Sequence, residues 1–289
     1  MQSEPARQPT EKRLGTIQEF TPARPDDSGD EALAAFREDG VVCMRGAFGA
    51  DWIAMLEKGI GEAIANPSWQ SSMTNLPGEA GFFFYDSLMW PRIEEFRKFI
   101  FGSHAPDLFM PFLETSEMIF YYDFVLLKEA HCDTAATCWH HDIGYYPLQG
   151  RKIINCWTAL DTVPLETALR FARGSQRGDT VHRAVHFNPE DAYENPMMER
   201  PVPPDFDESD DFEIITCPLS PGDCLVFNAW TFHTAPGNTT SQRRCAYSTN
   251  WVGDDVAFND IPQETDPPYR GENLVQGGSI VCESFPRIR

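Results

Sequence analysis

Trp139-His140-His141-Asp142 is the most informative stretch of the sequence. In a β-strand, residues i and i+2 point to the same face, so His140 and Asp142 can both aim into a barrel while His141 points away. A third ligand can come from His233, which follows a strand-like run far downstream. Two imidazoles and one carboxylate are the ligand set of non-haem Fe(II) oxygenases, and they leave positions open for a cosubstrate and O₂. We therefore expect His140, Asp142 and His233 to bind iron.

An arginine follows the remote histidine at a useful distance. Arg244 lies 244 − 233 = 11 residues after His233, at the start of the next expected strand. A planar guanidinium can grip the far carboxylate of a dicarboxylate cosubstrate with two hydrogen bonds. Arg243 is the rival for this role, and Thr234 or Thr239 could add a hydroxyl donor.

A His-x-Asp pair alone is weak evidence for a metal site. Such pairs arise by chance at surfaces, and a buried histidine is often satisfied by a neighbouring carboxylate. Here the strand context, the remote histidine and the arginine all agree, and this agreement favours iron.

Hydrophobic patterning divides the chain into a helical part followed by a strand-rich part. Residues 1–28 are rich in Pro, Arg, Gln and Asp and are predicted to form an arm. Helical spacing predicts helices over 30–38, 51–65, 92–101 and 106–113. Strand-like runs cover 41–44, 118–127, 153–160, 168–171, 212–217, 224–227 and 245–251.

Helices followed by short antiparallel strands predict an α+β fold with a jelly-roll core and the N-terminal helices packed on one side. We expect a single catalytic domain over residues 29–258. Residues 187–211 are acidic and Pro-rich and are predicted to be an insertion between strands. Residues 259–289 are predicted to be a C-terminal tail that wraps the surface.

The composition is that of an acidic globular protein. Of its 289 residues, 42% are hydrophobic and 12% aromatic, so a packed core is expected. The net charge of −21 argues against nucleic acid and anionic membranes as partners and leaves a small-molecule substrate. Eight cysteines without a Cys-x-x-Cys pair favour free thiols in a reducing compartment. No signal segment or apolar run of eighteen residues occurs, so we expect a cytoplasmic protein.

Several segments resemble the phytanoyl-CoA dioxygenase family as a set. Residues 137–147 are similar to the first metal motif of the family, and residues 222–227, leading to His233 and Arg244, are similar to the second. The remaining similar segments are 36–42, 156–161, 168–171 and 174–175. The resemblance extends over roughly residues 30–252.

This resemblance implies a double-stranded β-helix, a jelly-roll variant, that uses Fe(II), 2-oxoglutarate and O₂. It implies that the His-Asp-His set named above binds the iron and that Arg244 holds 2-oxoglutarate. It further implies that Trp157 and a residue near Phe124 line the cosubstrate pocket. Trp157 is otherwise as readily explained as a core aromatic.

Two positions bear on how far the resemblance carries. The family often has a serine two residues after the remote histidine, where this chain has Ala235, and Thr234 is then a candidate replacement. Related halogenases have a small residue in place of the metal-binding carboxylate. The carboxylate of Asp142 therefore favours hydroxylation or another oxidation of a C–H bond.

Other classes of function remain open from the sequence. A cupin-like jelly roll could bind metal or ligand without catalysis, but it would not need Arg244. A zinc hydrolase could use His182 and His186, which are spaced i, i+4, although the surrounding residues do not favour a helix. A scaffold that has lost activity is disfavoured by the complete His-Asp-His set. The sequence does not indicate the substrate or the oligomeric state.

Overall fold

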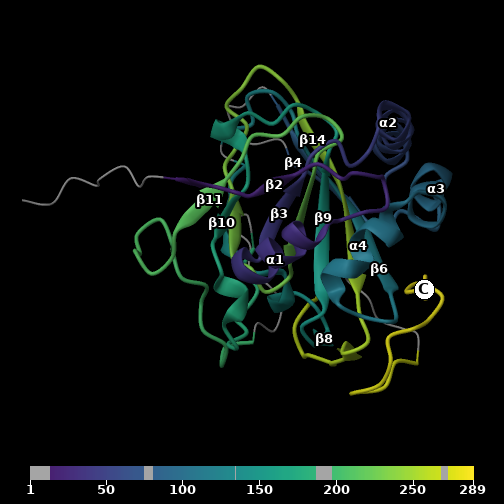
Figure 1. Cartoon of the computed structure of the whole chain (residues 1–289), viewed down its shortest axis with the longest axis vertical. Coiled ribbons are helices and arrows are strands. Elements are labelled where there is room, and N and C mark those ends of the chain that lie inside the picture. Colours follow the sequence, from purple (N-terminus) through teal and green to yellow (C-terminus); the bar gives the residue numbers. More distant parts are fainter. Residues whose placement is uncertain (1–13, 75–80, 134, 187–196, 268–272) are drawn as a thin grey trace, which may run out of the picture.

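The computed structural model describes residues 14–74, 81–133, 135–186, 197–267 and 273–289 (Figure 1). An eight-stranded sheet has the order β2–β3–β12–β9–β14–β6–β5–β4, and a five-stranded sheet has the order β1–β11–β10–β13–β7. A small third sheet pairs β15 with β8. The large sheet contains β2 (Glu19–Phe20), β3 (Val41–Met44), β4 (Ser72–Thr74), β5 (Phe83–Ser87), β6 (Ile119–Lys128), β9 (Ile153–Ala159), β12 (Cys224–Asn228) and β14 (Arg244–Val252). The others are β1 (Gly15–Thr16), β7 (Thr137–His140), β8 (Leu148–Gln149), β10 (Arg170–Ala172), β11 (Ile214–Thr216), β13 (His233–Ala235) and β15 (Ala257–Phe258).

In the described part of the chain, four α-helices precede most of the strands: α1 (Asp30–Asp39), α2 (Ala50–Ala65), α3 (Glu94–Gly102) and α4 (Ala105–Leu113). Figure 1 shows α2, α3 and α4 on the side of the molecule opposite β10 and β11. All four helices lie within one or two residues of the predicted ranges. Helix α1 ends at Gly40, whose left-handed conformation (φ 80°) lets its N–H reach the carbonyl of Phe36.

Successive side chains along the strands of the large sheet point to opposite faces, and each face contributes to a separate hydrophobic core. Val42 and Met44 of β3 pack among side chains of the helices. Val41 and Cys43 of the same strand pack instead with Phe171 of the five-stranded sheet. Because successive side chains of a strand point to opposite faces, the large sheet is covered by helices on one face and by the second sheet on the other. The predicted α+β fold is thus confirmed as mixed sheets with four helices, an arrangement consistent with a jelly roll.

Some strands were missed by the sequence patterns. Residues 15–16 and 19–20 of the predicted arm form β1 and β2, which pair in parallel with β11 and β3. The aromatic run at Phe83 forms β5, which pairs with β6. Strands β7 and β13 were predicted only through the ligands they carry, because they are four and three residues long.

The described parts of the predicted insertion and tail both contact strands or residues beside them. Residues 187–196 of the insertion lie outside the described residues, and residues 197–211 have neither helix nor strand. Phe206 packs edge-on against Trp139 of β7, with 5.3 Å between ring centroids. In the tail, Phe285 packs against Tyr121 and the N–H of Ile288 donates to the carbonyl of Met118. Among the described helices, none is long and apolar enough to cross a membrane.

Candidate active site

Two short strands of the five-stranded sheet bring the predicted iron ligands together. His140 is the last residue of β7 and pairs directly with His233, the first residue of β13. Asp142 does not lie on β7, as the sequence argument assumed, but begins a short 3-10 turn. His141 between them has extended backbone (φ −127°, ψ 143°), so the side chains on either side of it still point the same way. His141 itself lies on the opposite face, where its ring stacks on Phe232.

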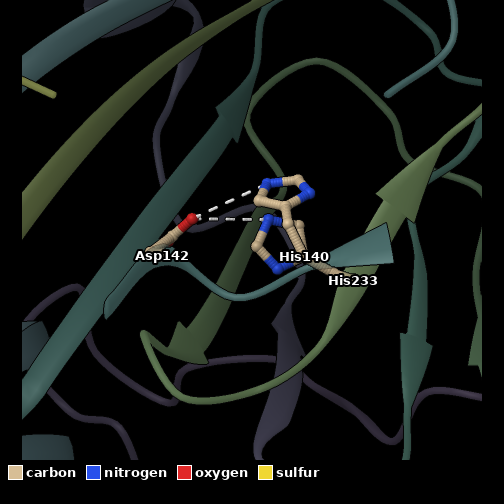
Figure 2. A group of neighbouring side chains, drawn as sticks. All are labelled: His140, Asp142 and His233. Carbon is tan, nitrogen blue, oxygen red and sulfur yellow. Dashed lines mark ion pairs between the residues drawn. The ribbon is translucent and has the colours of Figure 1, made fainter. Parts of the chain in front are cut away.

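Hydrogen bonds to the backbone orient both imidazoles. Nδ1 of His140 lies 2.8 Å from the carbonyl oxygen of Cys138, and Nδ1 of His233 lies 3.0 Å from that of Thr231. A carbonyl only accepts, so each Nδ1 carries the proton and each Nε2 is the ring nitrogen with the lone pair. These Nε2 atoms lie 3.9 Å (His140) and 3.6 Å (His233) from Oδ1 of Asp142 (Figure 2). Atoms that bind one ion at about 2.1 Å lie within ~4.2 Å of each other, and both separations meet this limit.

Burial favours the ligand form of both histidines. It lowers the pKa of His140 to about 3, assisted by the nearby His233, and lowers the pKa of His233 to about 4. Burial also raises the pKa of Asp142 to about 6, against the opposing effect of His140. Both imidazoles are therefore neutral near neutral pH, which is the state that binds a metal.

The second oxygen of Asp142 is held by the large sheet. Nδ2 of Asn155 lies 3.3 Å from Oδ2 of Asp142, and the hydroxyl of Ser248 donates to Oδ1 of Asn155. Asn155 is thereby fixed with its amide N–H groups toward the carboxylate. This contact leaves Oδ1 as the oxygen that faces the histidines.

The site opens into a cavity between the two sheets. Its lining includes the three candidate ligands, and no other group of three His, Cys, Asp or Glu side chains comes together in the part of the chain that the structure describes. The remaining lining residues are Tyr85, Tyr122, Phe124, Leu126, Lys128, Thr137, Tyr145, Tyr146, Asn155, Trp157, Leu169, Phe227, Ala235, Arg244 and Asp266.

The structure distinguishes the two candidate arginines. The guanidinium of Arg243 is engaged by two carboxylates, those of Asp161 and Glu57. Arg244 is buried, lines the cavity and donates only to the carbonyl of Thr167, while its Nε has no partner among the described residues. Burial lowers the pKa of Arg244 to about 10, which still leaves it charged at neutral pH. Only Arg244 is available to a ligand in the cavity.

Lys128 is a second basic side chain in the cavity, and the sequence argument missed it. It is the register partner of Arg244 across β6 and β14, and its Nζ donates to the carbonyl of Pro236 at 3.0 Å. Burial, followed by repulsion from Arg244, lowers its pKa well below the usual value. Among the described residues no carboxylate pairs with either basic side chain. The sequence did contain an indication of this role. Lys128 ends a strongly hydrophobic strand at the same alternate spacing as Phe124 and Leu126, so its side chain points to the same face as theirs.

The other predicted pocket residues divide into two groups. Trp157 and Phe124 are buried and line the cavity, and the Arg244 guanidinium lies 5.9 Å from the centre of the Trp157 ring. Thr234 does not line the cavity, because it alternates with the inward-facing His233 and its hydroxyl donates to the carbonyl of Thr137. The geometry gives no support to Thr234 as a cosubstrate ligand, and Thr239 is exposed.

Thr137 supplies a hydroxyl where Thr234 does not. It lines the cavity and is the register partner of Ala235, the position where the family often has serine. Its hydroxyl oxygen accepts the N–H of Ala235 at 2.8 Å. Thr137 therefore provides a hydroxyl on β7, directly opposite the position in β13 where the family often has serine and this chain has Ala235.

The two histidines of the alternative zinc site do not lie on a helix. His182 and His186 lie in a segment without regular structure, so i, i+4 spacing does not bring them to one face. The N–H of His182 donates instead to Nε2 of His141.

Residues 36–246 match the phytanoyl-CoA dioxygenase (PhyH) family. The chain belongs to this family. As a PhyH-family member it is a non-haem iron, 2-oxoglutarate-dependent enzyme, and its cofactors are iron and 2-oxoglutarate with O₂. No curated protein sequence gives a significant match.

Solved structures share the fold at low sequence identity. SnoK, a non-haem alpha-ketoglutarate-dependent carbocyclase from nogalamycin biosynthesis, is 19% identical, with a TM-score of 0.72 over 93% of this chain and 99% of SnoK. The epimerase SnoN in complex with Fe³⁺, alpha-ketoglutarate and nogalamycin RO is 22% identical, with a TM-score of 0.67 over 90% of this chain and 98% of SnoN. EvdO2 from Micromonospora carbonacea var. aurantiaca, complexed with 2-oxoglutarate, is 23% identical, with a TM-score of 0.59 over 90% of this chain and 100% of EvdO2.

The residues of this PhyH-family site fit both cofactors. Two neutral nitrogens and one carboxylate oxygen are a suitable donor set for ferrous iron. Nε of Arg244 and Nε1 of Trp157 are buried beside the same cavity without hydrogen-bond partners among the described residues. Buried polar atoms in proteins are normally satisfied, so these two donors are able to take a polar ligand.

Proposed function

We propose that the protein hydroxylates an unactivated C–H bond of a small-molecule metabolite, with release of succinate and CO₂. The observation that carries the proposal is the convergence of two neutral histidines, the carboxylate of Asp142 and the guanidinium of Arg244, which has no carboxylate partner among the described residues, on one cavity. We further infer that the two sheets form the double-stranded β-helix of the family, within one catalytic domain over residues 29–258.

His140, Asp142 and His233 would hold the iron through Nε2, Oδ1 and Nε2. Iron bound there would supply the O₂-activating chemistry that couples decarboxylation of 2-oxoglutarate to oxidation of the substrate. Arg244 and Lys128 would neutralise the cosubstrate carboxylates, and the planar guanidinium would fix the orientation of one of them. Lys128 would add charge without a fixed fork geometry.

Trp157 and Phe124 would exclude water from the cosubstrate and limit its freedom. Both rings are buried on the cavity wall, and dry surroundings strengthen the charge interactions with Arg244 and prevent leakage of the oxidising chemistry. The carboxylate of Asp142 occupies a metal position that halogenases leave to a halide. Oxygen insertion is therefore the reaction that this ligand set favours over halogenation. The shared fold does not decide between oxidations, since SnoK is a carbocyclase and SnoN an epimerase.

Anaerobic titration with Fe(II) and 2-oxoglutarate tests the site. The parent protein should develop the weak visible charge-transfer band of a chelated ferrous ion. His233→Ala should lose iron, and Arg244→Ala should require far more 2-oxoglutarate to form the band. Arg243→Ala is the matched control, because it removes the adjacent guanidinium from outside the cavity. Equal behaviour of the two arginine variants would refute the assignment of Arg244.

Aerobic incubation with panels of metabolites tests the reaction. Hydroxylation should give succinate in step with a product that has gained one oxygen atom from ¹⁸O₂. Tight binding of metal and 2-oxoglutarate with no succinate from any panel would favour a non-catalytic binding module instead.

A further inference from the structure

The cavity has two chemically different ends. Alternate residues of β6 line it from Lys128 to Tyr122, and the six residue-to-residue steps between them correspond to ~20 Å. Lys128 and its register partner Arg244 lie together at one end of this row. The other end of β6 provides aromatic side chains, Tyr122 and Phe124. A cosubstrate held by Arg244 and Lys128 therefore leaves the aromatic end free for another ligand.

Asp266, from the C-terminal part of the chain, lies at the aromatic end. Its carboxylate oxygens accept hydrogen bonds from the hydroxyl of Tyr85 at 2.7 and 2.9 Å. Its backbone N–H donates to the carbonyl of Tyr145. The Tyr85 ring lies 6.1 Å from that of Phe124. Asp266 is thus fixed in place on the cavity wall, close to aromatic faces.

The carboxylate of Asp266 has no cationic partner in the part of the chain that the structure describes. Burial raises its pKa to about 6, and the hydrogen bond from Tyr85 opposes this only partly. The described residues therefore leave the carboxylate of Asp266 available to a cationic ligand in the cavity. Rings of tyrosine and phenylalanine also attract organic cations through their faces.

We propose that the aromatic end binds a protonated amine of the substrate, with Asp266 as its ion-pair partner and the tyrosine rings around it. This inference rests on the proposed function and names the substrate class for it. The carbon to be oxidised would lie on the side of the amine that faces His140, Asp142 and His233. The acidic and aromatic end would reject a substrate that presents a carboxylate there, because it would face Asp266.

Calorimetric titration of the full chain with Fe(II) and 2-oxoglutarate under argon tests this inference. The probes are 2-phenylethylamine, 2-phenylethanol and 3-phenylpropionate, which share a ring and differ in charge. The parent should bind the amine at least about tenfold more tightly than the alcohol, and the acid more weakly than either. Asp266→Asn keeps the shape of the side chain and should abolish the preference for the amine.

Asp260→Asn is the matched control, because it removes the same charge from an exposed position on the same segment. It should keep the preference of the parent. If Asp266→Asn does not fold, Asp266→Glu retains the charge and should retain a preference for the amine. Absence of amine binding to the parent, equal binding of the three probes, or an unchanged preference in Asp266→Asn would each overturn the proposal.

The charge-transfer band separates this failure from that of the proposed function. A parent protein that forms the band but shows no preference for the amine refutes only the substrate class. A parent protein without the band refutes the cosubstrate site, whatever the probes do.

Discussion

At the scale of single residues, the two oxygens of Asp142 have different tasks. Oδ1 faces both histidines, whereas Oδ2 accepts from Asn155, which is itself oriented by Ser248. A carboxylate held in this way can give one oxygen to a metal and keep the other occupied. Asn155 is therefore a positioning residue for the candidate iron site, since it acts through Asp142.

Replacing Asn155 by alanine should weaken Fe(II) binding by about tenfold or more, because partners of metal ligands typically contribute that much affinity. Anaerobic metal titration measures the change. Asn66→Ala, a substitution at the exposed end of α2, should leave the affinity unchanged. Full Fe(II) affinity in Asn155→Ala would show that Asp142 needs no such support.

Asp123 is a buried carboxylate away from the cavity that should make stability depend on pH. It accepts from the N–H groups of Met89 and Trp90 and from the hydroxyl of Tyr247, yet burial raises its pKa to about 7. The folded protein then binds this proton more tightly than the unfolded chain. Its stabilising contribution is complete below about pH 4 and is lost as the pH rises through about 7, by at most ~1.4 kcal/mol per pH unit.

Asp123→Asn should remove this dependence. Denaturant unfolding in the presence of chelator, from about pH 4 to about pH 8, gives the free energy of unfolding of both proteins. The parent should lose stability relative to the variant as the pH rises. If the free energies of unfolding of parent and variant differed by the same amount at every pH, the carboxyl group of Asp123 would have the same pKa in the folded and the unfolded chain.

The residues that sequence reasoning found are those with a spacing rule or a chemical pairing. His140 and Asp142 follow from alternation in extended chain, and Arg244 from the needs of a dicarboxylate. Lys128 and Asp266 have no such rule, because their roles depend on which strands and which tail segment meet at the cavity. Their contribution was visible only after the register of β6 and β14 and the path of the tail were known.

At the scale of elements, long periodic segments were predictable and short ones were not. The four helices and β6, β9 and β14 have enough buried positions to show their period. Strands β7 and β13 are too short for a pattern, although they carry the candidate ligands. Turns were visible through glycine, as at Gly222 before β12, where φ is 91°.

Gly222→Ala should destabilise the protein more than Gly46→Ala. Both glycines have positive φ, so an alanine pays about 1–2 kcal/mol for the backbone at either site. At Gly222 a Cβ would also lie 2.2 Å from the carbonyl oxygen of Phe48, whereas at Gly46 it would meet nothing within 4 Å. Urea unfolding of the two variants isolates the cost of this contact. Equal losses of stability would mean that the turn relaxes without cost.

At the scale of the whole molecule, the two candidate histidine ligands come from one sheet, with Asp142 just after it, and the candidate cosubstrate residues come mostly from the other sheet. Binding that bridges both sheets should favour the folded state alone and so raise its stability. Composition and charge indicated a packed acidic protein. They did not show that one cluster of core residues packs under the helices and another between the two sheets, because this depends on which residues of each strand point to which face.

Fe(II) with 2-oxoglutarate, each at about 100 times its Kd under argon, should add about 2.7 kcal/mol per site and raise the Tm by several degrees. Chelator should reverse the shift. Asp142→Ala should show no shift with metal, while His131→Asn, an exposed change outside the cavity, should respond like the parent. A Tm that does not change with Fe(II) and 2-oxoglutarate would exclude a binding site that bridges the two sheets.

The short segment that contains β1 and β2 supplies an edge strand to each of the two main sheets. Strand β1 is at the end of the five-stranded sheet beside β11, and β2 is at the end of the eight-stranded sheet beside β3. A chain shortened to begin at residue 21 would lose both edge strands in a single step. Two rows of unpaired amide and carbonyl groups would then be bare at once, and such rows recruit other chains. Solubility during expression should therefore depend on a handful of residues remote from the chemistry.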